Sequence, residues 1–515
     1  MAPLTDLDEA NSTIVQLREE LDRLRGELRL MRQRMFGRRR EALDPNQLML
    51  FEAGIAKLEK LEQQAADSAA SAQVDPPKSK KKRGHGRAPF PDHLPREEIK
   101  LDLPEAERCC PDCGEAMRCI GTDVTERGHI IPARMMVKRY VRSKYGCPHG
   151  HTVKAAPMPP GVVDKAKYEP SVYAHIVTAK YGDHLPLHRL QGIFRRFGAH
   201  LPKQSMWDML ARFDEIAAKP ILVEMRRQLL EEDVLQADET PIKVQLEDQR
   251  GTRRGTLWVW RNTRGSPNEM SVADFKDDRS AKGPDAFLGD WTGKLLTDGY
   301  DGVNPTARQN AITRAGCWAH ARRKFRDALT AGATRAGLAL PPIQRLFWIE
   351  RAVVARAESR GFSRDQLVEL RHSVRNRRSK TVLRKLYEIV FALQEDPSTK
   401  GNDHLRKAVN YAINQRKPLL AHLDDGRLPI HNNDTERDLR HVVTGRKNWL
   451  MLASENGGRV AARLYSLVIS CKLANVNVER YLEDVLVAVA TTPASRVAEL
   501  TPWGWAKARG ATCES

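Results

Sequence analysis

The sequence has few cysteines, few aromatic residues and no long apolar run. It contains 8 cysteines in 515 residues, and aromatic residues make up 6% of the chain. No stretch approaches the ~18 consecutive apolar residues that a membrane-spanning helix needs. The first residues, MAPLTDLDEANST, are polar and acidic and lack the apolar core of a secretory signal. We therefore expect a cytoplasmic protein rather than a membrane protein or a disulfide-rich secreted one.

Acidic residues are too few to balance the basic ones. The chain has 85 Lys and Arg against 66 Asp and Glu, which gives a formal net charge of +19. A strongly basic protein favours a polyanionic partner, and nucleic acid fits best, so we expect DNA binding and association with the nucleoid. The length predicts several domains, because a single core rarely serves so long a chain.

The first 64 residues carry a leucine-rich seam that predicts a coiled coil and hence a homo-oligomer, at least a dimer. An amphipathic helix packed on its own chain would give the same pattern. Residues 65–105 are polar and rich in Lys and Arg, so they predict a flexible basic linker, either merely solvated or in contact with DNA phosphates. The seam consists of Ile14, Leu17, Leu21, Leu24, Leu28, Met31 and Met35.

Five of the cysteines cluster between positions 109 and 147, within a segment that we assign as residues 106–160. Cys110 and Cys113 form a CPxCG knuckle, and Cys147 lies near His149 and His151. Two thiolates at this spacing are typical of a structural Zn²⁺ site in a zinc-ribbon-like module. The alternative is a set of reduced structural cysteines. Branched and basic residues alternate between the two halves and predict strands.

Residues 161–222 contain two apolar-periodic helices separated by a break at Gly198, with Pro202 placed to begin the second. This spacing is typical of a helix-turn-helix, although two ordinary packed helices would look the same. Arg195, Arg196 and Lys203 beside the break are the candidate DNA contacts.

Residues 223–326 show the pattern of an α/β domain. One predicted strand ends at Asp238, a second covers Thr256 to Trp260, a third ends at Asp298, and a fourth leads into a basic helix at Trp318. Aspartates after strands are also common in ordinary turns. Glu239 and Asp301 are neighbouring carboxylates, which we place on the opposite strand face and beyond the strand.

A later helix begins near HNNDTER, where Asn433 is expected to be the cap and Glu436 the third helical residue. Glu436 would either fold back as a capping-box residue or point its carboxylate toward the sheet. Three carboxylates brought together repel one another unless cations neutralise them. Asp238, Asp298 and Glu436 therefore predict a site for two Mg²⁺ or Mn²⁺ ions, the hard ions that oxygen ligands select for phosphoryl transfer.

Further basic and aromatic residues lie close to these carboxylates in the sequence. Trp318 is expected in the core, and His320 on a turn is either structural or in contact with substrate. Candidate phosphate or base contacts follow Glu436, with a basic turn over a core tryptophan as the alternative. These candidates are Arg437, Arg440, Arg446, Lys447 and Trp449.

The stretch from His431 to Leu486, with NNDTER followed by GRKNW, resembles the catalytic domain of the insertion sequence 66 family of bacterial transposases. The resemblance extends through ADETP, TDGY, CWAHARRKF, the CPxCG knuckle and FGRRRE, so it covers nearly the whole chain. It implies a ribonuclease-H-like core whose DDE triad falls on Asp238, Asp298 and Glu436. Members usually show a second cysteine knuckle where this chain has Cys147, His149 and His151. Related elements often encode small accessory proteins.

The sequence thus predicts a multidomain α+β protein with a coiled coil, a zinc-ribbon-like module, a helix-turn-helix and a ribonuclease-H-like core. That core would comprise residues 223–326 and 428–490, interrupted by a helical insertion at 327–427 and followed by a tail at 491–515. The predicted function is metal-dependent nicking and strand transfer at insertion-sequence ends. The alternatives are a domesticated or decayed DNA-binding protein and a ribonuclease-H-type nuclease without strand transfer.

Overall fold

The chain forms two compact units, residues 1–130 and 131–515. The expected coiled coil, nearly all of the basic linker, and Cys110 and Cys113 fall outside the described residues. Among the described helices, none is both long and apolar enough to cross a membrane. A computed structural model describes these parts of the chain: residues 95–99, 115, 124–127, 133–149, 151–157, 166–246 and 251–510.

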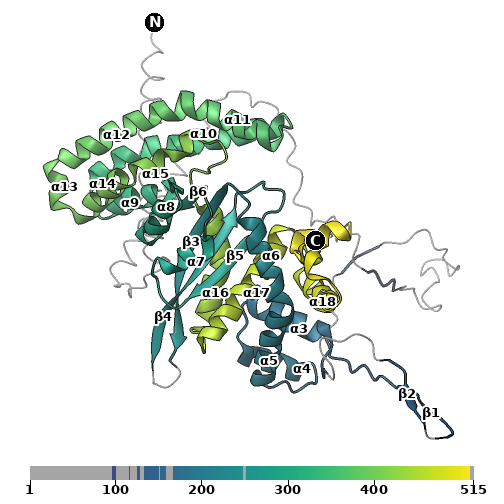
Figure 1. The fold of residues 1–515 in the computed structure, drawn as a ribbon. Coiled ribbons are helices and arrows are strands. Elements are labelled where there is room, and N and C mark those ends of the chain that lie inside the picture. Colours follow the sequence, from purple (N-terminus) through teal and green to yellow (C-terminus); the bar gives the residue numbers. More distant parts are fainter. Residues whose placement is uncertain are drawn as a thin grey trace. The chain divides into compact units, whose positions relative to one another are not determined.

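A mixed five-stranded sheet lies at the centre of the second unit (Figure 1). Its strand order is β5-β4-β3-β6-β7. Strands β3, β4 and β5 are antiparallel neighbours, and β6 and β7 run parallel to β3. The strands are β3 (Val234–Gln245), β4 (Thr252–Asn262), β5 (Ser271–Lys276), β6 (Lys294–Thr297) and β7 (Thr313–Gly316).

The four predicted strands are present as β3, β4, β6 and β7, whereas β5 was not predicted, and the bounds of the predicted strands need correction. We expected the first strand to end at Asp238, but β3 continues to Gln245. The reason is its partner β4, which pairs with it from Leu235 to Gln245. Asp238 therefore lies in the middle of a strand. The neighbouring strand β6 is shorter, and its parallel pairing with β3 ends at Gln236, two residues before Asp238.

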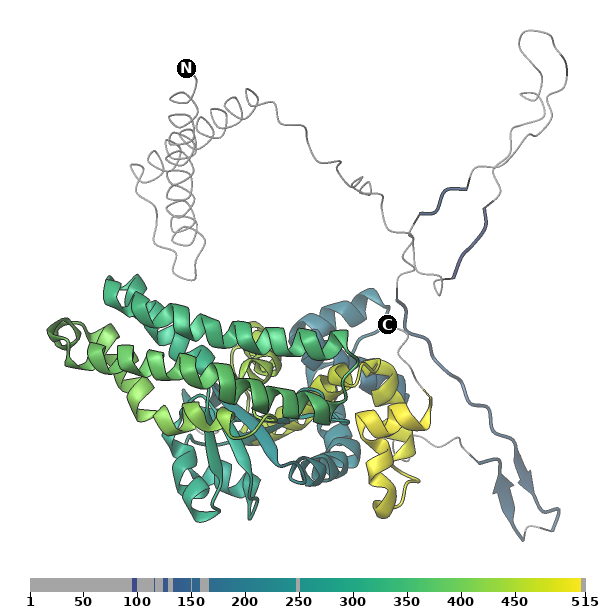
Figure 2. The same ribbon diagram turned by 90° about the horizontal axis from the view of Figure 1, so that it is seen from above.

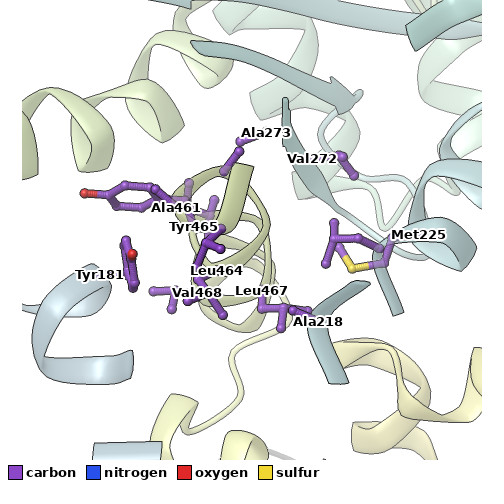
Figure 3. Close-up of a cluster of buried hydrophobic side chains, with 14 of the residues drawn as sticks. Tyr181, Ala218, Met225, Val272, Ala273, Ala461, Leu464, Tyr465, Leu467 and Val468 are labelled. Atoms are coloured by element: carbon purple, nitrogen blue, oxygen red, sulfur yellow. The ribbon is translucent and has the colours of Figure 1, made fainter. Parts of the chain in front are cut away.

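Helix α17 (Glu455–Leu473) packs against the sheet inside the main hydrophobic core, and 13 of its residues are buried. A helix that is apolar all round is expected inside a domain. Figure 3 shows its side chains among Tyr181, Met225 and Val272, which come from separate elements. A Cβ added at Gly458 would come within 2.7 Å of the Phe275 ring, so this glycine permits the close approach of α17 to β5.

Two serines of α17 hydrogen-bond to the backbone of β5, the strand at one edge of the sheet. The amide of Ala273 donates to Ser466 Oγ at 2.7 Å, and the amide of Ser271 donates to Ser470 Oγ at 3.1 Å. An edge strand leaves unpaired backbone groups that favour association with other chains. The two serines satisfy these groups within an otherwise apolar contact.

The two helices predicted on either side of Gly198 are confirmed as α4 (Leu187–Arg196) and α5 (Lys203–Phe213). Gly198 has φ +82°, a conformation that glycine adopts without strain. Pro202 is the residue before α5 rather than its first residue. The remaining helices of this unit outside the segment described next are α3 (Pro170–Val177), α6 (Lys219–Leu229), α7 (Lys282–Leu288), α8 (Asn304–Gln309), α16 (Asn433–Trp449), α18 (Val478–Ala488) and α19 (Pro502–Ala508).

A helical layer lies between β7 and α16 in the chain and packs around its own core (Figure 2). Buried Trp318, Phe325, Leu346 and Leu386 contribute to this core. The helices are α9 (Trp318–Thr330), α10 (Leu340–Ser359), α11 (Arg364–Val374), α12 (Lys380–Glu395), α13 (Pro397–Gly401), α14 (Asp403–Asn414) and α15 (Arg416–Leu420).

A buried cation and a buried histidine lie together in this layer. Arg375 is fully buried and donates to Glu350 at 2.7 Å and to the carbonyls of His422 and Asp425. His422 Nδ1 lies 2.8 Å from the Leu419 carbonyl. Burial, followed by the charge of Arg375, lowers the pKa of His422 to about 4. The imidazole is therefore neutral in the folded protein at neutral pH.

This histidine should make the protein sensitive to acid. The unfolded chain binds the proton below pH ~6.5 and the folded chain only below about 4, so the free energy of unfolding falls as pH drops through this window. Between these pH values the wild-type protein should lose free energy of unfolding, and we expect His422→Gln to abolish on the order of 2–3 kcal/mol of this loss. Urea unfolding at several pH values measures it. His404→Gln, at an exposed site on α14, is the matched control and should leave the pH profile unchanged.

Near Cys147 the structure corrects the predicted strands. Of the alternating stretch before Cys147, only β1 (Lys144–Gly146) is a strand, and it pairs antiparallel with β2 (Val153–Ala155). Most of residues 133–143 are exposed and have no strand partner in the described chain. Alternation alone does not make a strand, because the backbone needs a second strand with which to form hydrogen bonds.

Candidate active site

Asp238 and Asp298 are brought together by the parallel register of β3 and β6. The register pairs Gln236 with Leu296, and two residues further along come Asp238 within β3 and Asp298 in the turn after β6. The charge of Asp298 acts on the Asp238 carboxyl, so the two side chains lie near each other. Asp238 is 9% exposed, and its Oδ1 accepts the amide of Glu239 at 2.9 Å.

Asp298 follows directly after β6, in a turn that holds its backbone. Its Oδ1 accepts the amide of Tyr300 at 3.0 Å. Tyr411 of α14 donates its hydroxyl to the Asp298 carbonyl at 2.8 Å, so the helical layer helps to fix this turn. Gly299 has φ +99°, which allows the chain to turn away immediately after Asp298.

Glu436 lies in the first turn of α16, and the start of this helix is tied to the strand that carries Asp238. The expected cap is corrected: α16 begins at Asn433, and Asn432 is the N-cap. The Asn432 side chain does not cap the helix backbone. Its Nδ2 donates instead to the Ala237 carbonyl at 2.8 Å, so this one hydrogen bond sets the helix start beside the residue that precedes Asp238.

The carboxylate of Glu436 points away from its own helix backbone. Its Oε2 accepts from Arg323 at 3.3 Å, and its Oε1 lies 3.7 Å from His320 Nδ1. The capping-box alternative for Glu436 is therefore wrong for this helix, where no side-chain cap bond is formed. Both contacts come from α9, the first helix after β7.

Neighbouring carboxylates act electrically on Asp238. Burial, followed by the negative charge of Asp298, raises the pKa of Asp238 to about 8, and Glu239 and Glu436 act in the same direction. One unit of pKa is worth about 1.4 kcal/mol, so ionising Asp238 is costly without a compensating cation. Oxygen ligands with uncompensated negative charge fit hard divalent ions such as Mg²⁺ or Mn²⁺.

Glu239 and Trp318 lie as the sequence predicts. Glu239 is directed to the other face of β3 and pairs with Arg279, whose Nε lies 3.0 Å from its Oε1. Trp318 is buried and donates its indole N–H to the Leu419 carbonyl at 2.9 Å. The side chain of Asp301 is outside the described part of the structure.

Arg323 is a residue of this site that sequence reasoning missed. Its guanidinium contacts both His320 Nε2, at 3.4 Å, and Glu436. Burial and the Arg323 charge lower the pKa of His320, which favours its neutral form. The available signal was the helical spacing, because residues three apart share a helix face and Arg323 is three residues after His320.

The candidate DNA contacts on α4 and α5 are exposed to solvent. Arg195 and Arg196 end α4, and Lys203 begins α5. Their side chains therefore flank the Gly198 break and remain accessible.

The candidates on α16 differ from one another in their partners. Arg437, Arg440 and Lys447 are exposed, and Arg437 also donates to Asp434 at 3.1 Å. Arg446 is occupied within the fold, because it donates to Thr240 Oγ1 at 2.8 Å and to the Pro241 carbonyl.

Three of the five candidate zinc ligands lie around the β1–β2 hairpin. Cys147 Sγ is 3.8 Å from His151 Nδ1, and the rings of His149 and His151 are 6.0 Å apart. Cys110 and Cys113, the other expected ligands, fall outside the described residues. The three visible side chains can thus contribute soft ligands from one short turn.

Four family models match the chain. The model described as "Transposase IS66 family" matches residues 165–460, which is more than half of the chain. "Transposase C of IS166 homeodomain" matches residues 23–99, and "zinc-finger binding domain of transposase IS66" matches residues 107–149. "IS66 C-terminal element" matches residues 466–503. The protein is thus a multidomain mixed α/β protein with a zinc-finger domain and a DDE domain of this family.

Two similar proteins come from Sinorhizobium fredii. "Uncharacterized protein y4hP" is 29% identical over 520 residues, which cover 97% of this chain and 90% of the relative. "Uncharacterized protein y4jD" is 30% identical over 432 residues, which cover 81% of each protein. Together with the family-model matches, these similarities show that the chain belongs to the IS66 family of transposases.

Proposed function

We propose that this protein is a DNA transposase that nicks the ends of its insertion sequence and joins them to target DNA. One observation carries the proposal: β3, the turn after β6 and the start of α16, which carry Asp238, Asp298 and Glu436, lie next to one another although they are far apart in the chain. The sheet order, with three consecutive antiparallel strands and then two parallel ones, supports a ribonuclease-H-like core. Residues 223–326 and 428–490 would form this core around an insertion at 327–427.

The donor set fits a pair of hard divalent ions. All three groups offer carboxylate oxygens, and Glu436 Oε1 is a buried atom with no hydrogen-bond partner. A polar atom left in this way commonly marks the place of an ion or water. Bound Mg²⁺ would activate the attacking water or 3′-hydroxyl and stabilise the leaving oxygen.

The residues of the chain supply position and charge for this reaction. Tyr411 holds the Asp298 turn, Asn432 holds the start of α16 against β3, and Arg323 fixes the Glu436 carboxylate. Because separate elements hold the turn after β6, the start of α16 and the Glu436 carboxylate, the site would be preorganised, and preorganised groups need little rearrangement during reaction. No protein nucleophile is required.

The remaining parts would bind DNA and a second copy of the chain. The zinc-finger domain would use Cys110, Cys113, Cys147 and either His149 or His151 as ligands, and α4 and α5 would contact terminal inverted repeats. The N-terminal seam would form a dimer, and small proteins of the same element would act as accessory partners. Such a complex would work in the cytoplasm, on the nucleoid.

The experiment incubates purified full-length protein with labelled duplexes that carry the terminal inverted repeats of its element. We expect Mg²⁺-dependent nicks and, with target DNA present, joined products. Nicks without joined products under every target condition would favour the nuclease alternative. Salt-sensitive binding without any metal-dependent cleavage would favour a non-enzymatic DNA-binding protein.

The α4–α5 contact with DNA is tested by changing Arg195→Ala together with Arg196→Ala. If each guanidinium neutralises one phosphate, the slope of log affinity against log salt should fall in magnitude by about 2. Fluorescence anisotropy over a salt series measures this slope. The matched control changes Arg356→Ala with Arg360→Ala at the exposed end of α10, and an equal change in this control would contradict the assignment.

A further inference from the structure

Two helix starts place three different metal-ligating side chains at one point. Cys317 is the N-cap of α9, and His320 lies three residues later on its first turn. Glu436 enters from the first turn of α16. The thiol sulfur, an imidazole nitrogen and a carboxylate oxygen of these residues all lie within 4.8 Å of one another.

The backbone around this cluster locks the two helix starts together. The amide of Trp318 donates to the Ile430 carbonyl at 2.9 Å, and the amide of Asn432 donates to Cys317 Sγ at 3.2 Å. This N–H group would support the sulfur as a ligand once a bound cation has displaced the thiol proton, in the way that outer hydrogen bonds support metal ligands.

Two polar atoms in the cluster face each other without hydrogen bonds. His320 Nδ1 and Glu436 Oε1 are 3.7 Å apart, and both are buried with no partner. The other polar atom of each group, Nε2 and Oε2, contacts Arg323. Leaving a buried polar atom unsatisfied costs about 1–3 kcal/mol, so the facing pair indicates a place for a ligand.

We propose that Cys317, His320 and Glu436 form an inhibitory site for a thiophilic divalent ion, Zn²⁺ in the first place. The inhibitory role rests on the proposed function, because Glu436 cannot hold Zn²⁺ here and serve the carboxylate set beside Asp238 at once. Thiolate and imidazole ligands prefer Zn²⁺ to Mg²⁺, whereas the carboxylate set prefers Mg²⁺. One glutamate would thus be shared by two competing metal sites.

The geometry needs only a small closure to accept the ion. Bonds of about 2.3 Å to sulfur and 2.0–2.2 Å to nitrogen and oxygen put the ligand atoms of a tetrahedral site roughly 3.4–3.6 Å apart. The His320 and Glu436 atoms are already 3.7 Å apart. Binding releases the thiol proton to solvent. Because metal on Nδ1 puts the imidazole proton on Nε2, the Arg323 guanidinium has to withdraw from that nitrogen.

The binding test uses the full-length protein without DNA and titrates it with Co²⁺, a spectroscopic substitute for Zn²⁺. We expect Cys317→Ser to lose part of the near-ultraviolet band that thiolate-bound cobalt gives, and one equivalent of bound cobalt, relative to wild type. Cys471→Ser is the matched control, since Cys471 is also buried but lies in α17. His320→Gln should lose the same equivalent, which keeps the test valid if the serine variant does not fold.

The functional test titrates Zn²⁺ at fixed Mg²⁺ during end cleavage, with each rate expressed relative to the same variant without zinc. Zinc should inhibit the wild type, and more Mg²⁺ should relieve the inhibition. Cys317→Ser should need at least roughly tenfold more zinc for half-maximal inhibition, which corresponds to about 1.4 kcal/mol of zinc-binding free energy. Equal cobalt binding by Cys317→Ser and Cys471→Ser would overturn the site. Cobalt binding without zinc inhibition would overturn its inhibitory role. If neither the wild type nor the variants cleave DNA, the proposed function is refuted, and the cobalt titration still tests whether the metal site exists.

Discussion

Asp238→Asn is expected to slow Mg²⁺-dependent cleavage of element ends by about 10³-fold or more, equivalent to about 4 kcal/mol of transition-state stabilisation. Asparagine keeps the size of the side chain and an oxygen that can accept the Glu239 amide, but it removes the charge that faces Asp298 and Glu436. A neutral amide is a poor ligand for a hard cation beside phosphate. Single-turnover cleavage of labelled ends measures the loss.

The matched control is Glu239→Gln, which changes the neighbouring carboxylate on the opposite face of β3. Its partner Arg279 can still donate to the glutamine oxygen, so we expect less than a roughly tenfold loss of rate. A second measurement separates chemistry from folding, because Mg²⁺ should raise the melting temperature of wild type but not that of Asp238→Asn. Cleavage by Asp238→Asn at the wild-type rate would refute the assigned site.

The largest effect on stability is expected for Arg261→Met. Arg261 lies in β4 with 1% of its side chain exposed, and it donates to the buried Asp438 of α16 at 2.9 Å and to the more exposed Glu269 at 3.3 Å. Removing one member of a buried ion pair leaves the other charge uncompensated, at a cost of about 3–5 kcal/mol. Urea unfolding measures this decrease. Arg254→Met, at an exposed position of the same strand, should change the free energy of unfolding by less than about 0.5 kcal/mol.

A double variant tests the physical reason for this loss. Changing Asp438→Leu together with Arg261→Met removes both charges, and replacement of a buried pair by apolar residues is often neutral or stabilising. We expect the double variant to regain most of the lost stability. If it is as unstable as the sum of the two single variants, the packing of α16 rather than the unpaired charge explains the effect.

The sequence predicted the chemistry of the candidate site better than its geometry. Strand patterning and family motifs singled out Asp238, Asp298 and Glu436, and the residue types alone indicated hard cations. The bounds of β3 were wrong, because a strand continues for as long as its partner does and β4 lies beyond the local pattern. Arg323 was missed, because its contact with Glu436 spans 113 residues and helical spacing relates it only to His320.

Local rules also failed at the start of α16. We predicted Asn433 as the cap, one residue too late. Asn432 is the N-cap, but its side chain bonds to the Ala237 carbonyl instead of the helix backbone. That bond joins positions 195 residues apart. Capping preferences describe an isolated helix end, whereas here a tertiary hydrogen bond competes with them.

The sequence by itself determined the family, the basic charge, the α/β alternation and the kinds of residue that the site contains, because these depend on composition, periodicity and short motifs. The tertiary structure alone decided which atoms meet: the β3–β6 register that aligns two aspartates, the hydrogen bond that sets α16 beside β3, and the shared position of Glu436 between carboxylates and Cys317 with His320. Register, helix placement and burial arise from contacts between residues far apart in the chain, and their energies appear only when the whole fold has closed.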